Sequence, residues 1–438
     1  MSQLLTEPVA PARMDGADLR ERNLSVVLHD LMYSQPTSRS EIAERTGLAK
    51  ASLTQLIPEL ESLGLAIETT TSKPSTGRPS KMLAIHDGAL SIIVCEVTEL
   101  EITTETSSLM GNVLRFDREL HFVPMGGPDS IAFAMANTIG QHLETVRSAG
   151  SRTIHLVVVI DAPLSGERPI VHHSSELGWS DPVDLTSMLE NLLPELAGAI
   201  SIVSQVQVAA KAEFDALKRS SESLPKSVVF LKAGSSIGSA VVQNGKLLVG
   251  AQGMSPVLGH IEVSADGETC ECGRTGCFQT QVSLRKILEF AGLTPEIATK
   301  GTKAAMQTLV DRITDGDISA LLACEQLRSG LLTFAESLKF LYDPDYIVLG
   351  GYWAEIFQTL NLGTTSRQVL AAGSADRDNY QAPSGLVSFR PAQYGVRAAR
   401  VGAIQEVVTR VLRRPLALKG GQLVPTMGPI GSSPSYIW

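Results

Sequence analysis

Apolar residues near the start of the chain recur at helical intervals, separated by polar breaks. From Asn23 onward they fall three and four positions apart, at Leu24, Val27, Leu28, Leu31 and Met32. This spacing predicts an amphipathic helix. Pro36 is expected to end it, because proline lacks the backbone N–H that a helix interior needs. Residues 1–18 show no periodicity and are predicted to be a flexible leader.

Two further helices are predicted on either side of a short turn. Ser38 and Glu41 form the S-x-x-E pattern of a capping box, which predicts a second helix through Arg45. A third helix is predicted from Lys50 to Gly64, because glycine is common just past a helix end. The apolar positions of this third helix share one face: Leu53, Leu56, Leu60 and Leu63.

Two helices around a tight turn are typical of a helix-turn-helix, and a strand pair after them makes it a winged helix. The strands are predicted over 66–71 and 82–86, joined by a polar loop. Side chains expected to reach phosphates and base edges lie in this unit: Arg39, Lys50, Ser52, Thr54, Gln55 and Arg78. The alternative is a winged helix that binds another protein.

From Gly88 the pattern changes to apolar strands that alternate with helices. Strands are predicted over 91–97, 102–106, 112–116, 154–160, 227–231, 239–242 and 346–349. Helices are predicted over 130–147, 321–341 and 394–408, the last with Val396, Ala399, Val401 and Ile404 on its apolar face. This alternation is typical of an α/β fold, here in two lobes over residues 88–413.

The composition favours a soluble globular protein of the reducing cytosol. The chain has 438 residues, of which 43% are hydrophobic, and this length allows two or three domains. We find neither an apolar run of about 18 residues nor a secretory signal, which argues against a membrane span or export. Five cysteines do not form a disulfide framework pattern. A net charge of −9 still permits DNA binding, because that needs only a local basic surface.

One histidine and three of the five cysteines lie within residues 259–280. They are His260, Cys270, Cys272 and Cys277. Such a set completes a tetrahedral Zn²⁺ site with no position left for water, so the predicted ion is structural. The alternative is a group of buried free thiols beside an unrelated histidine. The clustering disfavours it, since the other two cysteines are isolated.

Residues 20 to 413 resemble the ROK family of repressors, open reading frames and sugar kinases. The spacing His260-x₉-Cys270-x-Cys272-x₄-Cys277 matches the zinc site of that family ligand for ligand. The segments SRSEIAERTGLAKASLTQL and STGRPSKML are similar to the repressor branch, in which the wing arginine, here Arg78, enters the minor groove. SSELGW resembles a surface segment of the first lobe. The resemblance implies a two-lobed body of the actin-like ATPase and ribonuclease H-like type.

Kinases of the family carry residues that this chain lacks. They open the body with Asp-x-Gly, where this chain has Glu96-Val97-Thr98. Their catalytic aspartate corresponds to Gln205, which cannot accept the proton of a substrate hydroxyl. The AGSSIG segment resembles the family's phosphate loop, but such a turn is equally typical of a plain hairpin. We therefore predict no catalytic residues and no enzyme activity, with a sugar kinase as the alternative.

The sugar-binding positions implied by the resemblance have also changed. Family members bind sugar hydroxyls with carboxylates beside the zinc histidine, and here Val257 and neutral side chains replace those acids. The candidate effector contacts are Ser204, Gln205, His260 and Gln279. Two interpretations stay open, a degenerate pocket that binds nothing and an effector other than a simple hexose, such as a modified or acidic one.

Together these patterns predict a cytoplasmic transcriptional regulator, a repressor of carbohydrate-related genes that binds a double-stranded operator. The expected parts are the leader 1–18, a winged helix 19–87, the ROK body 88–413 and a disordered tail 414–438. The resemblance implies a homodimer or a dimer of dimers. An effector would change the angle between the lobes and thus the spacing of the paired DNA-binding domains, which must match half-sites about 34–36 Å apart. An interaction protein without DNA binding is a further alternative.

Overall fold

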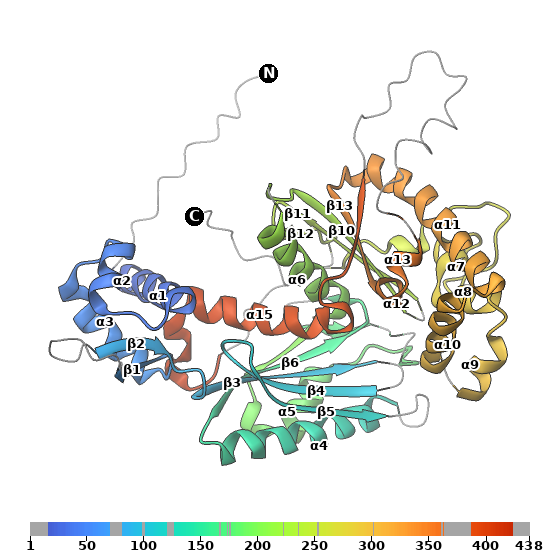
Figure 1. The fold of residues 1–438 in the computed structure, drawn as a ribbon. Helices are drawn as coiled ribbons and strands as arrows, with labels where there is room; N and C mark the ends of the chain where they lie inside the picture. The colour runs from blue at the N-terminus through green and yellow to red at the C-terminus, as the bar shows by residue number, and fades with distance from the viewer. Residues whose placement is uncertain are drawn as a thin grey trace, which may run out of the picture.

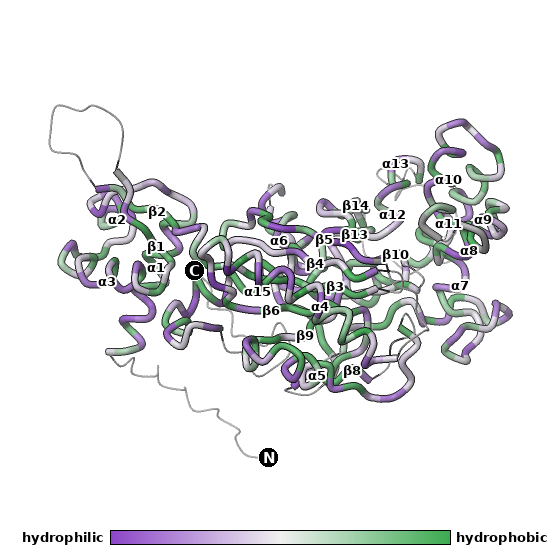
Figure 2. The backbone as a smooth tube through the Cα atoms, turned by 90° about the horizontal axis from the view of Figure 1, so that it is seen from below, coloured by the Kyte–Doolittle hydropathy of each residue, from purple (hydrophilic) through white to green (hydrophobic). Residues whose placement is uncertain are grey.

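A computed structural model describes residues 16–70, 81–98, 101–120, 127–165, 168–172, 174, 177–221, 223–234, 236–251, 254–300, 302–360, 362 and 387–423. A winged helix lies at one end of the molecule and helices α8–α10 lie at the other (Figures 1 and 2). Figure 2 shows hydrophobic positions along the central strands between these ends. The wing residue Arg78, most of the predicted leader and the tail beyond Leu423 lie outside the described residues.

The winged helix has the elements that the sequence predicts. They are α1 (Gly16–Ser34), α2 (Arg39–Thr46), α3 (Lys50–Ser62), β1 (Ala66–Thr70) and β2 (Lys81–Ile85). The capping box is confirmed, since the Ser38 hydroxyl accepts the backbone N–H of Glu41 and the Glu41 carboxylate accepts that of Ser38. Gly64, just past α3, has φ 76°, a conformation that favours glycine. The first helix begins at Gly16, three residues inside the predicted leader.

The first lobe is built on a sheet in which three strands form an antiparallel meander and two more pair in parallel. In spatial order these are β5 (Val113–Leu120), β4 (Glu101–Ser108), β3 (Leu90–Val97), β6 (Arg152–Ile160) and β9 (Ile200–Ser204). Helices α4 (Gly127–Ser148) and α5 (Leu185–Leu192) cover one face, and α15 (Ala398–Arg413) covers the other. The short strands β7 (Leu164–Ser165) and β8 (Ile170–Val171) form a separate pair.

The second lobe repeats the same strand topology. Its spatial order is β12 (Lys246–Leu247), β11 (Ile237–Gln243), β10 (Ser227–Ala233), β13 (Tyr346–Gly351) and β14 (Ser388–Pro391). Helix α6 (Gln205–Ser220) packs on this sheet and on α15. The remaining α-helices in the described part of the chain are α7 (Gln279–Val282), α8 (Leu284–Phe290), α9 (Thr294–Lys300), α10 (Thr302–Thr314), α11 (Ile318–Tyr342), α12 (Tyr352–Glu355) and α13 (Phe357–Leu360).

The chain remains packed beyond Arg413, where the sequence predicts a disordered tail. Residues Pro415–Gly420 form a 3₁₀ helix, and Leu418 and Leu423 are buried. The Leu423 backbone N–H donates to the Ile154 carbonyl, which fixes the segment to β6. The predicted boundary is therefore wrong for residues 414–423, because proline and glycine shape a packed turn here.

Two smaller predictions also differ from the structure. Trp179, at the end of the predicted surface segment SSELGW, is buried in the core of the first lobe. Val396 is exposed, because the C-terminal helix begins only at Ala398, after a 3₁₀ turn over Gly395–Arg397. Across the described residues, we find no helix with both the length and the apolar character needed to cross a bilayer.

Candidate functional site

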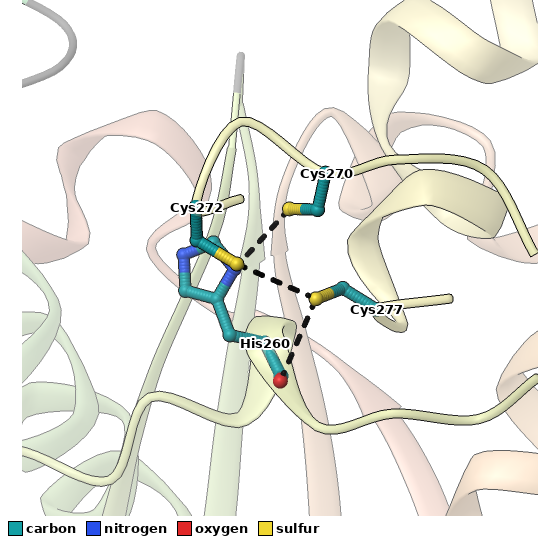
Figure 3. A group of neighbouring side chains, drawn as sticks. All are labelled: His260, Cys270, Cys272 and Cys277. Atoms are coloured by element: carbon teal, nitrogen blue, oxygen red, sulfur yellow. Dashed lines mark hydrogen bonds between the residues drawn. The ribbon is translucent and has the colours of Figure 1, made fainter. Parts of the chain in front are cut away.

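The structure brings together the four side chains predicted to bind a metal. His260, Cys270, Cys272 and Cys277 turn toward one another (Figure 3). Their ligand atoms all lie within 4.8 Å of one another. Nδ1 of His260 lies 3.4 Å from Sγ of Cys270, and the Sγ atoms of Cys272 and Cys277 lie 3.6 Å apart. Bonds to Zn²⁺ of about 2.0–2.3 Å in a tetrahedron place ligand atoms roughly 3.5–3.8 Å apart, so these residues fit the ion.

Glycines and backbone hydrogen bonds shape the loop that presents these ligands. Gly276 has φ 71°, and a Cβ there would lie 1.6 Å from the Ser264 carbonyl oxygen. Cys270 donates its backbone N–H to the Arg274 carbonyl, and Gly276 donates to the Glu268 carbonyl. Phe278, directly after the last cysteine, stacks on Phe334 of α11 at 3.8 Å between ring centroids. The loop is thus anchored to the core of the second lobe.

The thiols of the cluster differ in acidity. A backbone hydrogen bond from Arg274 lowers the pKa of Cys272 to about 7. Burial raises the pKa of Cys277 to about 12. Three neighbouring thiolates need a cation, and metal binding releases the protons that the thiols otherwise hold. The donor set therefore suits a divalent ion, with pH-dependent affinity.

Gln279 begins α7, two residues after the last cysteine, and contacts the cluster. Its Nε2 donates to Sγ of Cys270 at 3.4 Å, and both side chains are buried. Its Oε1 has no hydrogen-bond partner among the described residues. The predicted effector contacts His260 and Gln279 therefore both adjoin Cys270.

The other two predicted effector contacts, Ser204 and Gln205, are buried where β9 meets α6. Nε2 of Gln205 donates to Oε1 of Glu96 at 2.8 Å, and Oε1 of Gln205 accepts a hydrogen bond from Lys232. Lys232 also forms an ion pair with Asp161 at 3.2 Å. Because β10 carries Lys232 while Asp161 follows β6, this pair joins the two lobes.

Glu96 also forms an ion pair with a residue of the C-terminal helix α15. Arg400 of α15 pairs with Glu96, and its Nε lies 3.3 Å from Oε2 of Glu105. Side chains of all three residues are at least 92% buried, with exposures of 8%, 6% and 1% for Arg400, Glu96 and Glu105. Sequence reasoning missed this network. A lysine in the apolar strand 227–233 and an arginine among alanines in α15 are the signals that could have revealed it.

The predicted DNA contacts lie on the exposed side of the winged helix where the structure describes them. Lys50, Thr54 and Gln55 are exposed on α3, and Ser52 is partly exposed. Among the described residues no side chain caps α3, since Ala49 occupies the N-cap position. Arg39 forms an ion pair with Glu68 of β1 at 2.6 Å, and Lys81 pairs with the same carboxylate. Arg39 would have to give up this ion pair to contact DNA.

Two surface pockets lie away from the metal cluster. Cavities of about 360 and 600 Å³ adjoin each other at the amino-terminal ends of β13 and β14, and both are lined by Ser223, Tyr346 and Arg390. None of the predicted site residues lines either cavity. They therefore add nothing to the prediction of an effector site.

The fold and the cluster define a class of protein. It has two α/β lobes of the same sheet topology, an N-terminal winged helix and a Cys₃His loop in the second lobe. A profile described as the ROK family matches residues 125–406, more than half of the chain. The chain belongs to the ROK family. This match confirms the family resemblance and the predicted fold class, and similar repressors support the repressor branch.

Known proteins of both branches of the family are similar to this chain. The xylose repressor of Bacillus spizizenii is 23% identical over 341 residues, which is 77% of this chain and 84% of the relative. A ROK family transcriptional regulator described as a homolog of the E. coli MLC protein aligns with a TM-score of 0.69 at 19% identity, over 92% of this chain and 98% of that one. A glucokinase from Streptomyces griseus, bound to glucose and AMPPNP, aligns with a TM-score of 0.55 at 18% identity, over 72% of this chain and 98% of that one. At such identities the two structures establish the fold alone.

Proposed function

We propose that the protein is a DNA-binding transcriptional regulator, a dimeric repressor of carbohydrate-related genes that works in the cytoplasm. The observation that most supports this proposal is the winged helix in front of the ROK body, with Lys50, Thr54 and Gln55 exposed on α3. Lysine and threonine side chains bind phosphates, and glutamine reads adenine in the major groove. The uncapped start of α3 also leaves backbone N–H groups that suit a phosphate.

Packing between the winged helix and the body supports a regulatory role. Helix α1 packs on α15 and on residues 415–420, within one apolar cluster that continues into both sheets. Lys419 lies 3.3 Å from Glu59 of α3, and the Leu416 backbone N–H donates to Glu21 of α1. A change in lobe angle would therefore move the DNA-binding domain with α15 rather than leave it on a loose linker. In a twofold dimer such a rotation would alter the distance between the two recognition helices.

We further propose that the Cys₃His cluster holds a structural Zn²⁺. The donor set and the spacing of its atoms support this ion. Four protein ligands would leave no position for a substrate, so the ion would fix the 259–280 loop and supply no chemistry. His260 would use Nδ1 for the ion, because that nitrogen lies 3.4 Å from Sγ of Cys270.

The hydrogen bonds of Gln205 support the absence of kinase activity. Both ends of its amide are engaged, with Glu96 and with Lys232. A kinase base at this position would need a carboxylate that accepts a proton from the substrate. We therefore propose that this position holds the lobes together through Lys232. An effector other than a simple hexose fits this position, because Val257, Gln205 and Gln279 replace the carboxylates that the resemblance implies for binding sugar hydroxyls.

Gel shift with the DNA upstream of the protein's own gene tests the main proposal. Wild-type protein should shift this DNA, and Gln55→Ala should weaken binding roughly 5- to 150-fold, as expected for loss of a contact worth about 1–3 kcal/mol. Arg78→Ala should weaken binding as well. Lys218→Ala, which removes an exposed cation from α6, is the matched control and should bind as wild type.

Two further results would separate the alternatives. If neither its own upstream DNA nor genomic fragments selected in solution bind the wild-type protein, the interaction-protein alternative replaces the repressor. If purified protein phosphorylates glucose or an amino sugar with ATP, the kinase alternative is correct.

A further inference from the structure

We propose that Gln279 is a positioning residue of the metal centre, which orients the sulfur of Cys270 by donating an N–H···S hydrogen bond to it. This role rests on the proposed zinc site. It is distinct from contact with an effector, because the amide points its donor at the sulfur.

The orientation of the amide follows from its neighbours. A thiolate is only an acceptor, so the nitrogen end of Gln279 must face Sγ of Cys270, at 3.4 Å. Oε1 then lies on the side of Gly259, where a Cβ on that residue would come within 3.2 Å of it. The absence of a side chain at Gly259 makes room for this orientation. The same Cβ would lie 2.8 Å from the Ile237 carbonyl oxygen, so a larger residue would force the loop away from β11.

Burial strengthens the hydrogen bond. Gln279 is 7% exposed and Cys270 is 4% exposed, so water does not compete freely for either group. The unpartnered Oε1 is a cost that the protein tolerates at this position. The N–H···S hydrogen bond to a metal-bound sulfur offsets this cost, because hydrogen bonds to ionised groups are stronger than those between neutral groups.

The amide of Gln279 supplies a hydrogen-bond donor that the carboxylate implied for other family members at this position lacks. Three thiolates and a neutral histidine outweigh one dication, so the loaded centre is negative. A glutamate at residue 279 would add a second negative charge beside Cys270 and would have no hydrogen to donate. The neutral amide removes that repulsion and supplies a donor. Replacing a residue that hydrogen-bonds to a metal ligand typically weakens metal binding by about 10- to 100-fold.

Zinc affinity, measured by competition with a chromophoric chelator on the full-length protein, tests this role. Gln279→Leu should bind zinc about 10- to 100-fold more weakly than wild type, and Gln279→Glu should be at least as weak. Gln281→Glu is the matched control, because it adds the same charge two residues along α7 without the contact to sulfur. It should retain wild-type affinity.

A second measurement keeps the test decisive if a variant folds poorly. Cobalt-substituted wild type and Gln279→Leu should differ in the thiolate-to-cobalt charge-transfer band, because the N–H···S bond lowers the energy of the sulfur lone pair. Equal zinc affinity and identical cobalt spectra in wild type and both Gln279 variants would overturn the proposal. A wild-type protein that contains no zinc and binds none would instead overturn the zinc site itself, whatever the DNA-binding result.

Discussion

Replacing Arg400 with methionine tests whether the buried charge network stabilises the body. The substitution keeps an apolar chain of similar length but removes the cation between Glu96 and Glu105. Glu96 would keep its hydrogen bond from Gln205, and Glu105 would keep only Arg397, at 3.2 Å. Glu96 would then lose its paired cation, and Glu105 would lose one of its two.

The expected loss of stability follows from this burial. Removing one partner of a buried ion pair typically costs about 3–5 kcal/mol, because the remaining charge stays desolvated and unpaired. Arg400→Met should therefore lower the free energy of unfolding by about 3–5 kcal/mol. Arg413→Met, on the exposed last turn of the same helix, is the matched control and should change it by less than about 0.5 kcal/mol.

Urea unfolding followed by tryptophan fluorescence measures this effect in each lobe. Trp179 is buried in the first lobe and Trp353 in the second. With Trp438→Phe in every variant, Trp179→Phe and Trp353→Phe backgrounds therefore report on the lobes separately. Arg400→Met should affect the first lobe most. Adding Glu96→Gln, which keeps an acceptor for Gln205, should recover about 1–3 kcal/mol of the loss. A loss below about 1 kcal/mol for Arg400→Met, or no coupling to Glu96→Gln, would refute the reasoning.

Four further predictions concern other parts of the molecule. Cys272→Ser should leave the winged helix folded, as measured by circular dichroism, but weaken operator binding in gel shift. If the zinc-free variant instead binds the operator as wild type does, the metal stabilises only its own loop. Burial lowers the pKa of His155 from 6.5 to about 3, so its contribution is complete above pH 6.5 and declines as pH falls from there toward pH 3. In urea titrations the stability difference between wild type and His155→Gln should therefore shrink by about 1.4 kcal/mol per pH unit below pH 6.5, and a constant difference would contradict it. Leu418→Ala should cost about 2–5 kcal/mol in the same assay if residues 414–423 belong to the body, whereas a tail residue would cost nothing measurable. Gln205→Asp should not create phosphotransfer to glucose in a coupled ATP assay, because Lys232 and Asp161 still occupy the site; turnover would show that one residue separates the protein from the kinases.

The sequence alone was sufficient for features set by neighbouring residues. The capping box at Ser38 and Glu41, the helical spacing of α1 and α3 and the clustering of the metal ligands all depend on residues at most eighteen positions apart. Their backbone geometry or ligand chemistry is local, and for that reason pattern and spacing predicted them. The family resemblance extended this to the two-lobed body, which the repeated sheet order bears out.

Only the tertiary structure decided which distant residues meet. Glu96 and Arg400 are 304 positions apart, and Glu96 and Gln205 are 109 apart, so no local pattern pairs them. The same holds for residues 414–423. Their proline and two glycines are typical of a disordered tail, yet Leu418 and Leu423 are buried in the apolar cluster that includes residues of α1 and β6. These contacts depend on packing between segments far apart in the chain, and packing is a property of the folded chain rather than of any one segment.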